Sequence, residues 1–268
     1  MVLDVAPWIS EPVFCLTSDI DWASDASVRF FHESIYNADF PISYFLTNDS
    51  EYLSNLGDHA VEFGIHPNFL PGSSHGDSFD AVINTCLAYM PSPFFFRCHK
   101  YFDVDDTINK LLNIGCKFDS NLCTLMDTEL KPLTHRLGHT RLPVFWEDGA
   151  HLTHGFPLDF NAFDRSAFIS PGLKILNMHP MHYALNTPTQ LFARGIKDST
   201  ERSVWNAFSE SDIRRLEHNG KGIRNFIDEM LAWIRDREFT RMSLTDIYNV
   251  HMQTSTACAD RRSPVRGR

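Results

Sequence analysis

The sequence lacks the patterns that mark an exported or membrane-bound protein. None of its 268 residues belongs to an apolar run near the roughly 18 residues of a membrane span, and the first residues show no basic stretch followed by an apolar one. Its six cysteines are scattered without a C-x-x-C pair, which favours reduced thiols over disulfides or a cysteine zinc site. We therefore expect a cytoplasmic protein with no membrane span.

Three widespread active-site motifs are also missing. The chain has no G-x-S-x-G, no G-x-x-x-x-G-K-[ST] and no G-x-G-x-x-G, so serine hydrolases, phosphate-loop proteins and dinucleotide-binding proteins lose their usual support. The formal net charge of -10 argues against a nucleic-acid partner, which normally meets a basic face. A small molecule or a carbohydrate is the expected partner.

What the sequence does have is the alternation of an α/β protein. Short apolar runs such as 12–19 alternate with amphipathic stretches of helix length such as 25–40. This pattern predicts a parallel α/β sheet or barrel, and a closed or nearly closed barrel with six to eight strands accounts for it. We expect one domain over residues 1–250 and a disordered tail over 251–268, where the sequence is polar, basic and without periodicity.

Chemically useful side chains follow the apolar runs. In a barrel of parallel strands the carboxyl ends converge on one face, where such folds carry out their chemistry. One pocket could therefore hold the residues at or just past six candidate strand ends, which are Asp19, His66, Arg97, Asp119, Asp148 and His179.

Asp19 and Asp21 raise a question of charge. On a continuing strand the two carboxylates would point to the same side and repel each other, so a cation should lie nearby. Asp21, His66 and His75 would supply the carboxylate and imidazole ligands of a divalent ion, with zinc as the first choice. The alternatives are that each histidine is structural and that the D-x-D segment is a turn that caps the next helix.

Two further pairs complete a hydrolytic site. Asp19, beside a bound cation, could take a proton from water, and Arg97 could pair with Asp19 and hold its orientation, unless Arg97 forms a surface ion pair instead. His179 could protonate a leaving amine, with Asp148 fixing its tautomer.

The order of these elements resembles the polysaccharide deacetylases (the NodB-homology domain). The residues that carry the resemblance are "LTSDID", "EFGIHPNFLPGSSH", "FFFRCHKY", "VFWEDG" and "ILNMHP". Among the deacetylases the chain is most similar to the WbmS-like subgroup of O-antigen and surface-polysaccharide clusters. The resemblance implies a distorted (β/α) barrel, TIM-like and of the NodB type, with seven strands as the expected count. In such a barrel a metal ion activates water to remove acetyl groups from sugars.

Site residues follow from the same resemblance. Asp19 matches the catalytic base, Arg97 the arginine that tethers it, and Asp148 with His179 the pair whose histidine is the general acid. Metal ligands are matched by Asp21, His66 and His75, although His99 also lies near the expected site.

The implied activity is hydrolysis of a sugar N-acetyl group in O-antigen biosynthesis, on a free, nucleotide-linked or lipid-linked precursor. The alternatives are a catalytically silent carbohydrate-binding or scaffold protein on the same fold, and a related amidohydrolase such as a deformylase.

Overall fold

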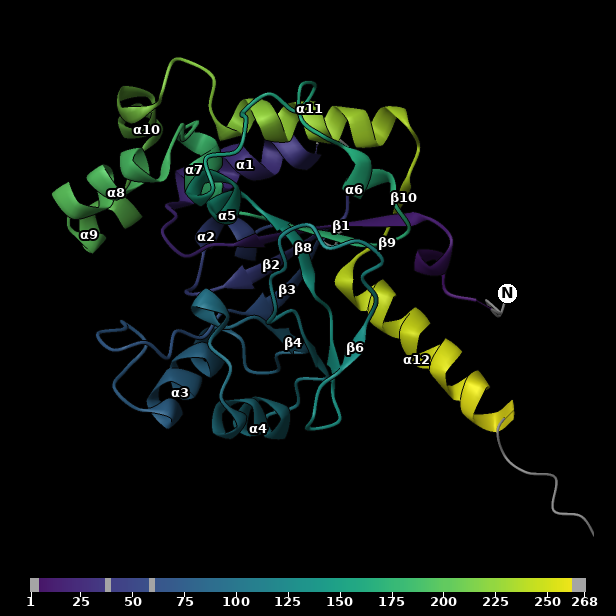
Figure 1. Ribbon diagram of the computed structural model, residues 1–268. Coiled ribbons are helices and arrows are strands. Elements are labelled where there is room, and N and C mark those ends of the chain that lie inside the picture. The colour runs from purple at the N-terminus through teal and green to yellow at the C-terminus, as the bar shows by residue number, and fades with distance from the viewer. Residues whose placement is uncertain (1–4, 37–39, 58–60, 262–268) are drawn as a thin grey trace, which may run out of the picture.

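The computed structural model describes residues 5–36, 40–57 and 61–261, which form a mixed sheet surrounded by helices (Figure 1). In the described part of the chain the sheet has ten strands, nine of them in the order β6-β7-β5-β4-β3-β2-β1-β9-β8, and β10 pairs with β1. All neighbours are parallel except β6 and β7. The strands are β1 (Pro12–Asp19), β2 (Ile42–Leu46), β3 (Val61–Ile65), β4 (Phe95–Phe96), β5 (Phe118–Asp119), β6 (Leu133–Thr134), β7 (Thr140–Arg141), β8 (Val144–Glu147), β9 (Gly172–Met178) and β10 (Thr240–Arg241).

The helices follow the strands along most of the chain and cover the sheet. Three-residue 3₁₀ turns are η1 (Pro7–Ile9) and η2 (His99–Tyr101). The α-helices are α1 (Asp25–Tyr36), α2 (Glu51–Ser54), α3 (Phe79–Tyr89), α4 (Asp105–Asn113), α5 (Asp148–Thr153), α6 (Ser166–Ile169), α7 (Pro180–Ala184), α8 (Gln190–Ser199), α9 (Arg202–Asn206), α10 (Glu210–Leu216), α11 (Ile223–Asp236) and α12 (Leu244–Arg261).

The predicted fold class, a distorted (β/α) barrel, is confirmed, but the predicted count of seven strands is wrong. Several strands, including β6, β7 and β10, are only two residues long. A two-residue pairing is too short to show the alternation of polar and apolar residues by which strands are predicted. An isolated parallel bridge between Cys123 and Val144 links β8 to the segment after β5, so the two sides of the barrel approach each other.

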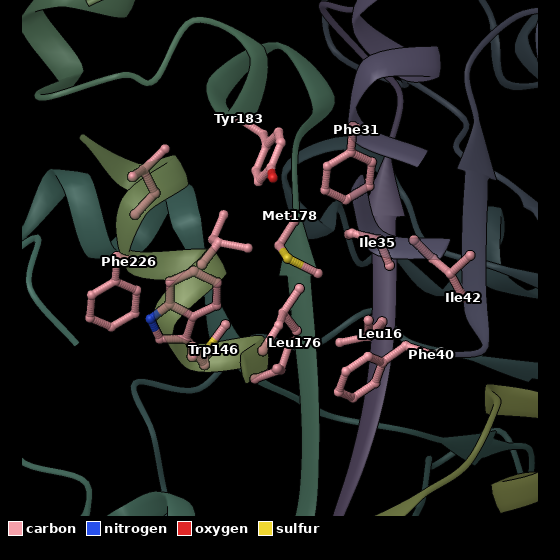
Figure 2. Close-up of a cluster of buried hydrophobic side chains, with 14 of the residues drawn as sticks. Leu16, Phe31, Ile35, Phe40, Ile42, Trp146, Leu176, Met178, Tyr183 and Phe226 are labelled. Carbon is pink, nitrogen blue, oxygen red and sulfur yellow. The ribbon is translucent and has the colours of Figure 1, made fainter. Parts of the chain in front are cut away.

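The central strands β1 and β9 are buried along their whole length, as expected for parallel strands covered on both faces. On one face Leu176 and Met178 of β9 pack with Trp146 and with Phe226 of α11 (Figure 2). The indole of Trp146 stacks on the Phe226 ring, with ring centroids 5.6 Å apart. This packing fixes β8 and β9 relative to each other and so fixes the residues at their carboxyl ends.

The six residues predicted at strand ends lie where they were expected. Asp19 and Asp119 are the last residues of β1 and β5. The other four directly follow a strand, and they are His66, Arg97, Asp148 and His179. Because neighbouring strands are parallel, these positions lie along one edge of the barrel.

The C-terminal segment differs in part from the predicted tail. Helix α12 continues to Arg261, through part of the segment 251–268. Its first turn is stabilised by a reciprocal cap, in which Asp246 N–H donates to Ser243 Oγ and Ser243 N–H donates to the Asp246 carboxylate. Residues 262–268 lie outside the described residues, and the domain boundary at 250 stays a prediction.

Candidate functional site

Asp19 is held between two donors at the end of β1. Arg97 Nη1 donates to Asp19 Oδ1 at 2.8 Å, and Asn177 Nδ2 donates to Asp19 Oδ2 at 2.9 Å. Burial alone would raise the pKa of Asp19, but the Arg97 guanidinium outweighs it and the pKa is lowered. Asp19 is therefore a carboxylate in a fixed orientation, as the prediction for Asp19 and Arg97 required.

Arg97 is fully buried, and its guanidinium is bonded on every side. Besides Asp19 it donates to Ser120, both to the backbone oxygen at 3.0 Å and to Oγ at 2.8 Å, and to Thr17 Oγ1 at 3.1 Å. The Phe45 ring covers it, with the centroid 4.1 Å from Cζ. A buried cation with this many acceptors is rigid, so it positions Asp19.

Asp21, His66 and His99 form a second group beside Asp19. His66 Nε2 lies 3.7 Å from Asp21 Oδ1, and His99 Nδ1 lies 3.3 Å from Asp21 Oδ2. One ligand atom of each residue lies within 4.8 Å of the others. Burial lowers the pKa of His66 to about 4, so its imidazole is neutral and can bind a metal ion.

The buried polar atoms of this group fit a divalent cation. Asp21 Oδ1 and both ring nitrogens of His66 have no hydrogen-bond partner among the described residues. Buried polar atoms are normally paired, so atoms left unpaired at one point need a ligand. One carboxylate and two imidazoles form the three-ligand set of a catalytic zinc site and are also compatible with other divalent transition metals.

The structure does not bring His75 to this group. Its Nε2 lies 2.7 Å from the Thr47 carbonyl oxygen, and its Nδ1 accepts a hydrogen bond from Asn68 N–H at 3.3 Å. Both ring nitrogens are thus engaged by the backbone. His99, which begins η2 three residues after β4, lies in this group in place of His75.

His179 faces the same point from the end of β9. Asp148 Oδ1 lies 2.6 Å from His179 Nδ1, and the His179 backbone N–H donates to Asp148 Oδ2 at 2.8 Å. His179 Nε2 is left 3.7 Å from Asp21 Oδ1 and 3.9 Å from Asp19 Oδ2. Burial opposes protonation, but Asp148 and then the two aspartates raise the pKa of His179 to about 10. The predicted pair of Asp148 and His179 therefore exists and presents a protonated Nε2.

Asp119 belongs to a different cluster. Its carboxylate accepts from Arg141 Nε at 2.8 Å and lies 2.6 Å from His139 Nε2. Arg141 also donates to Asp103 at 2.7 Å. Asp119 thus connects β5 with β7 and lies outside the pocket. The pocket brings together the other five predicted strand-end residues.

A cavity of about 230 Å³ opens beside Asp21 and His99. Trp22, Trp205, Lys197 and Thr47 are among the side chains that line it. A larger cavity, of about 530 Å³, lies at the start of α3, but Asp77 is the only ionisable residue in its lining, which offers no set of catalytic groups. The cavity of about 230 Å³ is the candidate substrate site because it borders Asp21 and His99.

Sequence reasoning missed Asn177. Thr17 Oγ1 and Arg97 Nη1 both donate to Asn177 Oδ1, while its amide nitrogen donates to Asp19. The residue lies two positions before His179 in an otherwise apolar strand. A polar side chain inside such a run was the available signal, because a buried amide needs several partners.

The site therefore lies at the carboxyl edge of a (β/α) barrel and combines carboxylates, a buried arginine and histidines. The family model described as "WbmS-like: Polysaccharide deacetylase" matches residues 16–192. The chain therefore belongs to the WbmS-like polysaccharide deacetylase family.

One solved structure agrees with this assignment. WbmS of Bordetella bronchiseptica, described as a proposed polysaccharide deacetylase involved in O-antigen biosynthesis, is 27% identical, with a TM-score of 0.70 over 82% of this chain and 90% of that one. The peptidoglycan deacetylase PdaC of Bacillus subtilis is 12% identical, with a TM-score of 0.47 over 97% of this chain and 100% of that one. Among the curated proteins none matches this chain. None of the described helices is long and apolar enough to cross a membrane.

Proposed function

We propose that the protein is a metal-dependent carbohydrate deacetylase that hydrolyses the N-acetyl group of a sugar in O-antigen biosynthesis, in the cytoplasm. One observation carries the proposal: unpaired buried atoms of Asp21 and His66 lie beside a carboxylate, Asp19, that Arg97 and Asn177 hold in a fixed orientation. Unpaired ligand atoms next to a positioned base are what hydrolysis by activated water requires.

Asp21, His66 and His99 would hold the ion. A divalent cation bound there supplies Lewis-acid polarisation of the acetyl carbonyl and lowers the pKa of water. His66 directly follows β3, Asp21 lies two residues after β1, and His99 begins η2, three residues after β4. Zinc is the first choice because it accepts this mixture of imidazole and carboxylate.

Asp19 and His179 would move the protons. As water adds to the acetyl carbon, Asp19 accepts its proton, and Arg97 and Asn177 keep the carboxylate in place. The carbon–nitrogen bond then breaks, His179 Nε2 gives a proton to the departing amine, and acetate leaves. Asp148 holds the imidazole through Nδ1, so Nε2 is the atom that faces the substrate.

Acetate release from N-acetylhexosamines, measured beside the metal content of the purified protein, tests the proposal. Wild-type protein should release acetate and lose activity with a chelator, and Asp21→Asn should lose both metal and activity. Asp25→Asn is the matched control, because Asp25 is a nearby carboxylate that accepts from Ser50 and lies outside the group. Full activity after verified removal of the metal would refute the proposal.

A further inference from the structure

Two cationic side chains line the candidate substrate cavity without a carboxylate partner. Lys197 of α8 and Arg202 of α9 both border the cavity that holds Asp21 and His99. Within residues 5–36, 40–57 and 61–261, neither has a carboxylate oxygen within the 4.0 Å of an ion pair. The chain has 34 acidic and 24 basic residues, so unpaired cations at one cavity are not explained by an excess of positive charge.

The same helix shows the contrast. Arg194 also lies on α8, exposed to solvent, and it pairs with Asp198 at 3.2 Å. Lys197, one turn further along, instead places its ammonium 4.1 Å from the centroid of the Trp22 ring. A cation–π contact orients an ammonium without neutralising it, so Lys197 keeps its charge for another partner.

Lys197 and Arg202 share a cavity lining with Asp21 and His99. Burial lowers the pKa of Lys197, Asp21 raises it and Lys100 lowers it again, so Lys197 lies within range of both. His75 lines the same cavity. Burial lowers the pKa of His75, the hydrogen bond to the Thr47 backbone raises it, and the positive charge of Arg202 lowers it. Lys197 and Arg202 therefore bring two positive charges to the lining of one cavity.

Like charges that converge around a small cavity repel each other, and an anion between them removes the repulsion. The cavity volume of about 230 Å³ is below the roughly 300–1,000 Å³ of sites for drug-sized ligands, which suits a single sugar unit. Trp205, part-buried in the same lining, offers an apolar face beside Arg202. A sugar ring with a charged substituent matches both features.

We infer that the substrate carries an anionic oxygen group, a phosphate or a carboxylate, on the acetylated sugar, and that Lys197 and Arg202 bind this group. The inference rests on the proposed function, since it requires the acetyl group to lie at Asp21, His66 and His99. Both cations lie beyond residue 192, where the match to the family ends. They are specificity residues of this chain and take no part in the bond-breaking step.

Binding of three N-acetylated sugars to the zinc-loaded protein tests the inference. Binding is measured through quenching of tryptophan fluorescence, to which Trp22 and Trp205 of the cavity contribute. The probes are N-acetylglucosamine, which is neutral, its 1-phosphate, and N-acetylglucosaminuronic acid, a carboxylate. At least one charged sugar should bind about tenfold or more tightly than the neutral one. If the sugar 1-phosphate binds more tightly than the uronic acid, the charged group is a phosphate, and the reverse order indicates a carboxylate.

The double variant Lys197→Gln/Arg202→Gln should lose this preference, whereas Arg194→Gln, the control from the same helix, should keep it. Equal binding of all three sugars, no binding up to millimolar concentrations, or an unchanged preference in the double variant would overturn the inference. Acetate measured in the same samples separates the two claims. Charge-selective binding without acetate release contradicts the proposed function alone, and equal acetate release from neutral and charged sugars contradicts the anion site alone.

Discussion

Two clusters of aspartate and histidine lie along the barrel, and they differ in how their charges are balanced. In one, Asp119 contacts His139 and Arg141 at 2.6 to 2.8 Å. In the other, Asp21 lies farther from its histidines, at 3.7 Å from His66 and 3.3 Å from His99.

The difference depends on one arginine. Arg141 neutralises Asp119 and connects it to Asp103, so the carboxylates of the first cluster are balanced without a ligand, and His139 Nδ1 is the buried atom there that has no hydrogen-bond partner among the described residues. Near Asp21 the buried arginine, Arg97, is committed to Asp19, and Asp21 Oδ1 stays without a hydrogen bond among the residues that the structure describes. Similar residue types therefore give a structural cluster where the charges are balanced and a candidate metal site where they are not.

Exchanging histidine for alanine in each cluster should give the largest contrast. His66→Ala removes two unpaired ring nitrogens, so we expect the protein to lose its metal and acetate release to fall to background. His139→Ala should keep the metal. Elemental analysis of the gel-filtered variants, with acetate assays, measures both. Retention of a full equivalent of metal by His66→Ala would contradict this role.

Asp19→Asn tests the base beside the metal site. The asparagine oxygen can still accept from Arg97, but it cannot take a proton, so we expect turnover to fall by about 10²–10⁴-fold with metal content unchanged. Steady-state kinetics and metal analysis on the same preparation check this. Wild-type turnover in this variant would exclude Asp19 as the base.

Asp119→Ala tests the paired cluster through stability. It leaves Arg141 without one of its two carboxylates in a largely buried setting, which should cost about 3–5 kcal/mol of the free energy of unfolding. The exposed pair of Asp80 and Lys110 provides the control, and Asp80→Ala should cost less than about 1 kcal/mol. Urea unfolding compares them, and equal losses would show that Asp119 is no more important than a surface carboxylate.

Replacing the two competing histidines should have a smaller effect on metal binding. We expect His99→Gln to weaken zinc affinity by at least about 10–100-fold, which is the cost of losing an outer-shell partner, because it removes one ligand of three. His75→Gln should leave the affinity near that of the wild type, since both His75 nitrogens bond to the backbone. Competition with a chromogenic chelator measures both affinities, and the reverse order would return the ligand role to His75.

Lys174 gives the smallest expected effect, as a buried cation with no carboxylate partner in the described chain. Its ammonium donates to Ser170 Oγ at 3.1 Å, and burial lowers its pKa from 10.5 to about 8. Between these values the unfolded chain binds more protons, so stability should rise with pH from about 8 to 10.5. Lys174→Met should therefore stabilise the protein by about 1–2 kcal/mol at neutral pH.

Thermal unfolding of Lys174→Met and wild type across that pH window checks the sign. The advantage of the variant should shrink above pH 8 and disappear near the ordinary lysine pKa. A variant that is less stable than wild type at neutral pH would show that the charge of Lys174 is well compensated.

The strand-end residues could be predicted because each follows an apolar run, and the parallel sheet brings such ends together. The choice between His75 and His99 could not, since it depends on a loop in which Asn68 and Thr47 engage the His75 ring. The contact of Asp119 with Arg141 could not be predicted either, because Arg141 lies 22 residues away in a two-residue strand. Contacts of this kind leave no periodic pattern in the sequence.

Anomalous diffraction at the zinc edge, from crystals of the wild-type protein supplied with zinc, tests the central claim most directly. We predict one strong peak bounded by Asp21, His66 and His99, and none at Asp119 and His139. A peak at His75, a peak at the Asp119 cluster, or no peak at Asp21 would contradict the assignment of the metal site.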